Sequence, residues 1–387
     1  MNKVVFKNFS KKNKNFKKLK VILNSIINTD SEIIKSLKPN YKYSYKTSLL
    51  RKIKKFKNIR IFGIGGSILG SKAIYQFLID KIKNKILFVD DISDIKLNSK
   101  KNFLNLIISK SGNTIETIAN INLNIGKKDK NVIITDNNKN ILRELSLKLK
   151  SNIINHNNFI GGRYSVLSEV GMLPAELMGF KESRFKQFNN LVKSDRFLNN
   201  IVSNVGYILS LLNKKKSNSI ILNYDEKADG ILKWYQQLVG ESLGKKGKGI
   251  LPIISSMPKD NHSLMQYYLD GQDSNFYTFF FTQEKFKKKI GNRYLDKSQH
   301  FLKNKDINQI LFAKHKASEK VFKRKKIPFR SFIIKERSPE SMGELFCFFI
   351  IETILLGKAL GVNPYDQPSV ELIKIETKKI LSNYRIP

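Results

Sequence analysis

Short apolar runs separated by longer polar or amphipathic stretches are the feature that most limits how this chain can fold. They fall at 59–64, 85–90, 103–109, 131–136 and 151–156, and again at 218–224, 247–255, 275–281 and 329–335. Each run is rich in Ile, Leu, Val or Phe and is bounded by polar residues, which is typical of buried parallel strands joined by helical crossovers. The pattern predicts an α/β protein.

The two groups of runs predict two tandem αβα sandwiches, each with a mainly parallel sheet, and a long C-terminal helix at 369–381. A helical region at 166–212 lies between the groups. The expected division is a basic, mostly helical lead-in at 1–50, a first domain at 51–200 and a second domain with the C-terminal helix at 201–387. No linker or repeat marks the boundary, which the sequence places between 180 and 215.

Positive charge is in large excess, with 71 Lys and Arg against 32 Asp and Glu and a formal net charge of +39. Such an excess suggests a nucleic-acid or other anionic partner. The lysines, however, are spread through nearly every segment and interleaved with Asn and Ile, three residue types with AT-rich codons. We therefore expect no nucleic-acid interface, although a diffuse positive field helps to attract a phosphorylated substrate.

The chain has one cysteine, Cys347, within the apolar run LFCFFII. A disulfide framework and a thiolate metal site are therefore not available, and a small core residue in a reducing compartment is expected. The first 20 residues are basic but have no apolar core of a signal peptide. No stretch approaches the ~18 apolar residues of a membrane span. These features predict a soluble, cytoplasmic protein without a membrane partner.

A glycine-rich stretch, RIFGIGGSILGSK at 60–72, follows the first apolar run. It fails as a dinucleotide fingerprint because Ile68 stands in place of the third glycine, and as a P-loop because Ser71 precedes Lys72. What remains is a strand-to-helix turn around Gly66 and Ser67, where free N–H groups favour an anion. Taken alone, a plain tight turn explains the stretch equally well.

A second turn of this kind, IISKSGNTIETI at 107–118, also follows a buried run and opens a helix. It gathers Ser109, Lys110, Ser111 and Thr114, whose hydroxyls and ammonium suit a phosphate monoester bound without a metal. The alternative is an ordinary N-cap, which needs only one hydroxyl. Two such turns at the carboxyl ends of strands in one sheet predict a ligand crevice there.

Together with four further motifs, these turns resemble the glucose-6-phosphate isomerase family and its sugar-isomerase fold. The further motifs are GGRYSVLSEVGMLP at 161–174, WYQQLVGESLGKKGKG at 234–249, DNHS at 260–263 and NPYDQPSVELIK at 363–374. The resemblance covers about residues 60–387. It implies two sugar-isomerase domains, a homodimer, no cofactor, no metal, and interconversion of glucose 6-phosphate and fructose 6-phosphate.

By motif position, the resemblance implies four catalytic residues. Glu241 matches the base that moves a proton between C1 and C2 through a cis-enediol(ate), and one carboxylate can serve both carbons. Arg163 matches the arginine whose guanidinium stabilises the enediolate. His262 and Lys374 match the pair that opens the sugar ring, and in the family the histidine comes from the neighbouring subunit.

Substrate and phosphate contacts follow from the same correspondence. They are assigned to Gly66, Ser67, Ser109, Lys110, Ser111, Thr114, Gln237 and Gln367. The chain departs from common family patterns at Asn261, where Gln is frequent, and at Gly112 and Asn113. Neither departure touches the four catalytic positions.

Each assignment has a plainer alternative. Glu241 could be a solvated helix acid or the i,i+4 partner of Lys245, and Arg163 could pair structurally with a carboxylate. The histidines outside the motifs, His156, His300 and His315, are expected to be surface or core residues.

Two other functions fit parts of the pattern. One is a different sugar-phosphate isomerase on this fold, such as a dual glucose/mannose 6-phosphate enzyme. The other is a non-catalytic sugar-phosphate-binding regulator, which would have the phosphate turns but not the base. The presence of Glu241 with His262 and Lys374 favours the isomerase.

Overall fold

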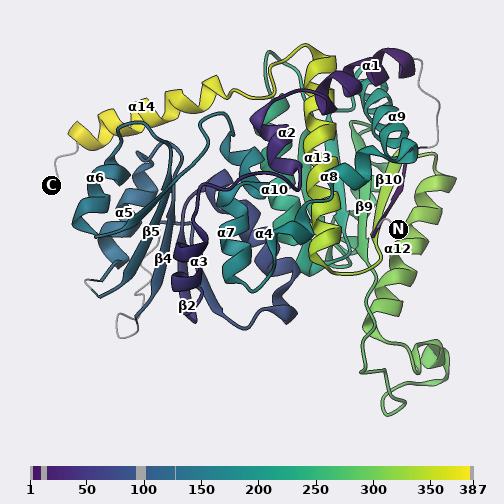
Figure 1. Ribbon diagram of the computed structural model, residues 1–387. Coiled ribbons are helices and arrows are strands. Elements are labelled where there is room, and N and C mark those ends of the chain that lie inside the picture. The colour runs from purple at the N-terminus through teal and green to yellow at the C-terminus, as the bar shows by residue number, and fades with distance from the viewer. Residues whose placement is uncertain (1–2, 10–14, 93–101, 127, 384–387) are drawn as a thin grey trace.

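The computed structural model describes residues 3–9, 15–92, 102–126 and 128–383 of the chain and contains two five-stranded sheets (Figure 1). The strands are β1 (Val4–Lys7), β2 (Asn58–Phe62), β3 (Lys85–Val89), β4 (Leu104–Ile108), β5 (Lys130–Thr135), β6 (Asn152–Asn155), β7 (Asn218–Asn223), β8 (Leu251–Ser256), β9 (Asn275–Thr282) and β10 (Phe329–Ile334). Every apolar run named above forms one of these strands, so the α/β prediction is confirmed.

Helices cover and separate the sheets. They are α1 (Phe16–Ile27), α2 (Glu32–Leu37), α3 (Thr47–Ile53), α4 (Leu69–Phe77), α5 (Ile115–Asn124), α6 (Ile141–Lys148), α7 (Glu169–Leu177), α8 (Phe188–Val192), α9 (Asp195–Leu212), α10 (Asp229–Leu243), α11 (Met265–Asp270), α12 (Ile307–Arg324), α13 (Pro339–Leu360) and α14 (Pro368–Asn383). Short 3-10 turns that matter for the site are η1 (Gly65–Ser67), η3 (Gly162–Leu167) and η6 (Lys259–Asn261).

The first sheet has the order β3-β2-β4-β5-β6, and all its strand pairs are parallel. The second sheet has the order β1-β10-β9-β7-β8 and is parallel except for β1, which runs antiparallel to β10. β2 and β4 are neighbours, so the two turns that follow them lie at the same carboxyl edge. This edge is where parallel α/β sheets bind ligands.

The N-terminal segment contains α1 and α2, and ahead of them the strand β1, which the sequence did not predict. This strand covers the edge of β10, and the carboxylate of Glu344 on α13 accepts hydrogen bonds from the N–H groups of Lys3 at 2.8 Å and Val4 at 2.9 Å. The expected division near residue 200 falls inside α9 and stays a prediction.

A layer of helices between the sheets forms the middle of the molecule, with α13 running through it (Figure 1). α13 starts at a capping box between Ser338 and Ser341 with Pro339 in its first turn, and it stops at Gly361 in the left-handed conformation (φ 69°). Its middle is apolar on all sides because it is packed on all sides. One continuous hydrophobic cluster joins residues of both sheets through these helices.

α14 confirms the predicted C-terminal helix but has no buried residue. Figure 1 shows it extending from the middle of the molecule out past α6. Among the described residues, no helix is both long enough and apolar enough to span a bilayer.

Candidate active site

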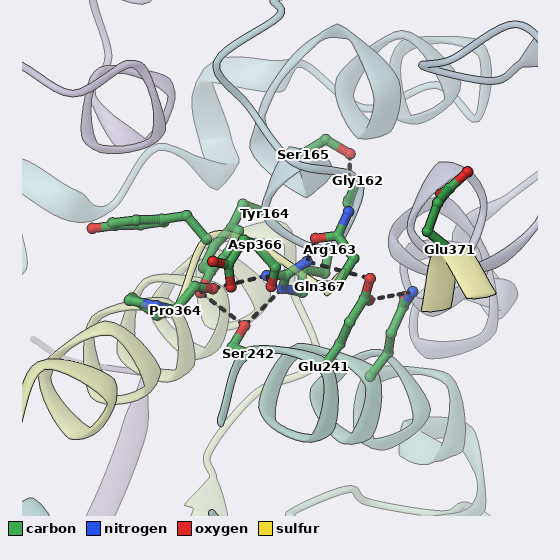
Figure 2. Close-up of polar contacts among 12 residues, drawn as sticks. Gly162, Arg163, Tyr164, Ser165, Glu241, Ser242, Pro364, Asp366, Gln367 and Glu371 are labelled. Atoms are coloured by element: carbon green, nitrogen blue, oxygen red, sulfur yellow. Dashed lines mark hydrogen bonds and ion pairs between the residues drawn. The ribbon is translucent and has the colours of Figure 1, made fainter. Parts of the chain in front are cut away.

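Arg163 lies at the centre of the candidate site and is 2% exposed. Its Nε donates to Ser242 Oγ at 2.7 Å, and its Nη1 donates to Gln367 Oε1 at 2.8 Å. Its Nη2 donates to the backbone carbonyl oxygens of Pro364 at 2.8 Å and Asp366 at 3.0 Å (Figure 2). These partners lie more than 70 residues from Arg163 in the chain. The planar, forked guanidinium can bond to all of them at once, and they fix its orientation.

Glu241 faces this guanidinium from α10. Its Oε1 lies 3.3 Å from Nη1 of Arg163, and its Oε2 accepts a hydrogen bond from Gln237 Nε2 at 3.1 Å. Gln237 lies one helical turn earlier, which is the spacing that brings side chains together on one helix face. The Glu241 side chain remains 22% exposed, so the carboxylate is oriented by two partners and still open to a ligand.

Lys245 does not pair with Glu241, because α10 ends at Leu243 and the i,i+4 geometry is lost. Instead its Nζ donates to the carbonyl oxygens of Asn363 and Asp366, both at 2.5 Å, and to Asp366 Oδ1 at 2.6 Å. The Lys245 hydrogen bond holds the pKa of Asp366 below its usual range. The loop that carries Gln367 is thus held by both Arg163 and Lys245.

The glycine-rich turn packs directly against the start of η3. A Cβ on Gly66 would lie 2.2 Å from the carbonyl carbon of Gly162 and 2.5 Å from the backbone nitrogen of Arg163, so only glycine fits there. Gly65 has φ +56°, and a Cβ there would meet Gln237 Nε2 at 2.9 Å. In the described part of the chain, the half-exposed Ser67 hydroxyl makes no hydrogen bond.

The second turn places its polar groups at the start of α5. The hydroxyls of Ser109 and Thr114 are 2.8 Å apart, and Lys110 Nζ donates to the Asn158 carbonyl at 2.6 Å. Burial lowers the pKa of Lys110, Asp136 opposes this, and the charge of Arg163 adds to the lowering.

The simple N-cap alternative is not realised at Thr114. This residue occupies the N-cap position of α5, but its side chain caps no backbone N–H. Ser111 is exposed, and its Oγ accepts from the Asn113 N–H at 3.3 Å. Asn113 points elsewhere, because its Oδ1 accepts from the Ile141 N–H of α6 at 3.1 Å. The hydroxyls of Ser111 and Thr114 therefore do not cap α5 and remain available to a ligand.

Among the described residues, no polar contact joins His262 and Lys374. His262 is exposed and follows η6 at the carboxyl end of β8. Lys374 lies on α14 with its side chain 60% exposed, and its Nζ is 3.0 Å from Glu371 Oε2. Among the described residues, neither makes a polar contact with Glu241 or Arg163.

The other histidines lie apart from the site. His156 is buried, with Nδ1 2.7 Å from Glu169 Oε1, and His315 is buried among aromatic rings. His300 is exposed. These placements agree with their expected roles as core or surface residues.

The sequence did not single out two further residues of the site. Ser242 accepts from Arg163 and lies 2.9 Å from the Tyr164 hydroxyl, which donates to the Pro364 carbonyl at 3.0 Å. Burial raises the pKa of Tyr164 to about 12, so it stays a neutral donor. In the sequence, Tyr164 directly follows Arg163 and Ser242 directly follows Glu241. This adjacency is the only feature of the sequence that could have indicated their place in the site.

Comparison with known proteins supports the family seen in the motifs. A family model described as phosphoglucose isomerase matches residues 32–251. Glucose-6-phosphate isomerase from Methanocaldococcus jannaschii is 33% identical over 353 residues, covering 84% of this chain and 83% of the relative. The enzyme of the same name from Mycoplasmopsis pulmonis is also 33% identical over 353 residues, with 83% and 82% covered.

Solved structures show the same fold. A hypothetical protein from Thermus thermophilus superposes with a TM-score of 0.81 at 22% identity, covering 95% of each chain. A glucose-6-phosphate isomerase from Chlamydia trachomatis superposes with a TM-score of 0.73 at 18% identity, covering 95% of this chain and 84% of that one. The segment matched by the family model includes Gly66, Arg163 and Glu241 and spans more than half of the sequence, and this chain belongs to the phosphoglucose isomerase family.

Proposed function

We propose that this chain interconverts glucose 6-phosphate and fructose 6-phosphate, with Glu241 as the base that carries the proton between C1 and C2. The family match and the names of relatives at 33% identity support the reaction. The observation that carries the assignment of the base is the Glu241 carboxylate, oriented by Arg163 and Gln237 and still open to a ligand.

In the open-chain aldose, Glu241 removes the proton from C2. The C2 electron pair forms the C1–C2 double bond, and the C1 carbonyl oxygen becomes an oxyanion. The hydroxyl proton on O2 then passes to O1, and Glu241 returns its proton to C1, which gives the ketose with no net gain or loss of protons. One carboxylate beside both carbons is sufficient for this transfer.

Arg163 stabilises the enediolate through its charge. Its three nitrogens already contact five acceptors, namely Ser242, Gln367, Glu241 and two backbone carbonyls. A cation that is already oriented needs no reorganisation when negative charge develops beside it. A direct hydrogen bond to substrate requires Gln367 or Glu241 to release Nη1.

The phosphate group is bound by the two turns after β2 and β4. Ser67, Ser109, Lys110, Ser111 and Thr114 supply hydroxyls and an ammonium, and the Gly66 backbone lets the phosphate or sugar approach closely. Gln237 and Gln367 complete the substrate pocket from α10 and from the loop before α14. The adjacency of β2 and β4 supports this assignment.

Ring opening is assigned to His262 and Lys374, and the active form is a homodimer in the cytoplasm. Imidazoles as a class titrate near neutral pH, which suits proton transfer to the ring oxygen. The exposed position of His262, without a polar contact to Glu241 of its own chain among the described residues, supports a role in the site of the neighbouring subunit.

A coupled assay with fructose 6-phosphate tests this function directly. Glu241→Gln keeps the shape of the side chain but removes the base, so kcat is expected to fall about 10²- to 10⁴-fold. Binding of 6-phosphogluconate, an open-chain phosphorylated sugar acid, should persist. Glu226→Gln, at a carboxylate with 94% exposure just before α10, is the matched control and should keep full activity.

Near-normal turnover by Glu241→Gln would rule out this base. Comparable wild-type rates on mannose 6-phosphate would favour the dual-substrate isomerase. Binding of sugar phosphates without any turnover would favour the regulator.

A further inference from the structure

The carboxylate of Asp260 connects the turn that carries His262 to the second sheet. Its Oδ2 accepts from the Ser255 hydroxyl at 2.8 Å and from the Ser256 N–H at 2.7 Å, both at the end of β8. Its Oδ1 accepts from the Ser263 hydroxyl at 2.9 Å. Asp260 therefore has hydrogen bonds to residues on both sides of His262.

We propose that Asp260 is the positioning residue for His262, an inference that rests on the proposed function. It sets where the imidazole lies when it reaches the substrate, and it does not itself touch the substrate. The backbone alone closes the turn, through bonds from the His262 N–H to the Lys259 carbonyl at 3.0 Å and from the Leu264 N–H to the Asp260 carbonyl at 2.9 Å. These bonds shape the turn, and the Asp260 side chain fixes it to β8.

Two observations distinguish this role from that of an ordinary turn cap. Ser255, one of the anchors, is fully buried in the sheet, so the carboxylate connects the turn to a rigid element. His262 itself is exposed, so packing of its own side chain does not fix its position. The hydrogen bonds from Ser255, Ser263 and the Ser256 N–H outweigh the effect of burial and lower the pKa of Asp260, so these partners favour its charged form.

The chain offers a conservative variant that separates geometry from charge. In Asp260→Asn, the amide oxygen can accept from Ser255 and Ser256, and the amide nitrogen can donate to the Ser263 hydroxyl, which accepts as well as donates. All three contacts survive without the negative charge. Asp260→Ala removes all three.

The kinetic test compares these variants with a capping aspartate away from His262. Asp306→Ala is the control, because Asp306 caps α12 by accepting from the Gln309 N–H at 2.9 Å. For Asp260→Ala, kcat on glucose 6-phosphate is expected to fall about 10- to 100-fold, as for a catalytic group displaced by about 1 Å. Its dissociation constant for open-chain 6-phosphogluconate should stay within about 2-fold of wild type, because this ligand needs no ring opening. Asp260→Asn should restore kcat to within about 3-fold.

Three results would overturn the proposal. One is a loss of kcat in Asp260→Ala no larger than in Asp306→Ala. Another is a parallel loss of 6-phosphogluconate binding, which would indicate collapse of the whole site. The third is an Asp260→Asn variant as impaired as Asp260→Ala, which would indicate a role for the charge rather than for the position.

A readout that needs no activity keeps this test separate from that of the proposed function. The full chain contains four histidines, so its imidazole NMR signals are few, and His262→Gln identifies the one of interest. In Asp260→Ala the His262 signal should shift or broaden, and in Asp260→Asn it should match wild type. An unchanged signal in Asp260→Ala overturns the positioning role. A wild-type protein without isomerase activity would instead overturn the proposed function alone.

Discussion

Two glycines near the site differ in what a methyl group would meet. Gly66 faces the backbone of Gly162 and Arg163, whereas Gly240, directly before Glu241 on α10, has nothing within 4 Å of a methyl group placed on its Cα. Backbone atoms cannot rotate away as a side chain can. The close packing of η1 against η3 thus excludes any side chain at Gly66. At Gly240, packing leaves room for a methyl group, so glycine is needed there only if α10 must be flexible.

This contrast gives a paired prediction. Gly66→Ala should push η1 away from Arg163, lower the free energy of unfolding by about 1–3 kcal/mol and lower kcat/KM. Gly240→Ala should raise the free energy of unfolding by about 0.5–1 kcal/mol and keep activity. Urea unfolding and the coupled assay measure both effects, and equal behaviour of the two variants would contradict the packing argument.

Single residues also show which contacts of the site could be predicted from the sequence. The motifs placed Arg163, Glu241, Gln237 and Gln367 together, and their contacts agree. The carbonyls of Pro364 and Asp366 that fix Arg163 could not be predicted, because any residue type supplies a backbone carbonyl. The catalytic and binding roles of all these residues, and those of His262 and Lys374, stay predictions.

Lys186 connects two elements that the sequence does not relate. Its Nζ donates to the Leu167 carbonyl at the end of η3, at 2.5 Å, and to the Ser36 carbonyl in α2. The rings of Tyr41 and Tyr43 lie about it, 5.0 and 5.1 Å from Nζ. Burial lowers its pKa to about 7. Since η3 carries Arg163, this contact supports the site from behind.

The lowered pKa of Lys186 predicts a pH-dependent stability. Between pH 7 and about 10.5 the unfolded lysine is protonated and the folded one largely neutral, so the unfolded state binds more protons and stability rises with pH. From pH 7 to 8.5, Lys186 should raise the free energy of unfolding by up to about 1.4 kcal/mol per pH unit. Lys186→Met should remove this slope, whereas Lys52→Met, at an exposed position of α3, should not. Equal slopes in wild type and Lys186→Met, from urea titrations, would contradict the prediction.

Among the elements, the parallel strands could be predicted and β1 could not. Buried parallel strands are apolar on both faces and therefore stand out in the sequence. β1 has only four residues in a lysine-rich segment, and its pairing with β10 depends on residues more than 300 positions away. The apolar VVF at 4–6 was the only local signal. The helix spacing of Lys245 was also misleading, because this residue lies beyond the end of α10 and pairs with Asp366 in a loop.

For the molecule as a whole, the proposed dimer makes a prediction about mixed subunits. Glu241→Gln and His262→Ala should each be nearly inactive alone. If His262 acts in the neighbouring subunit, a dimer containing one of each has one complete site, formed by Glu241 of one chain and His262 of the other. Random mixing should then restore about one quarter of wild-type activity, because about half of the dimers are mixed and each has one site of two.

Activity of the subunits mixed after unfolding and refolding together measures this recovery. Mixing without subunit exchange is the control and should restore nothing. Absence of recovery after exchange would place His262 in the site of its own chain. The charge of +39 does not enter this comparison, because both variants share the rest of the sequence.

The pairing of β1 with β10 also concerns the order in which the protein is made. Among the described strands, β1 leaves the ribosome before all the others, and its partner β10 leaves after them. At about 5–20 residues per second, the N-terminal strand waits roughly 15–65 s for the edge that it covers. The first sheet, by contrast, draws all its strands from residues 58–155 and can assemble meanwhile. β1 is thus already present when β10 emerges, and only then can it cover the edge of the second sheet.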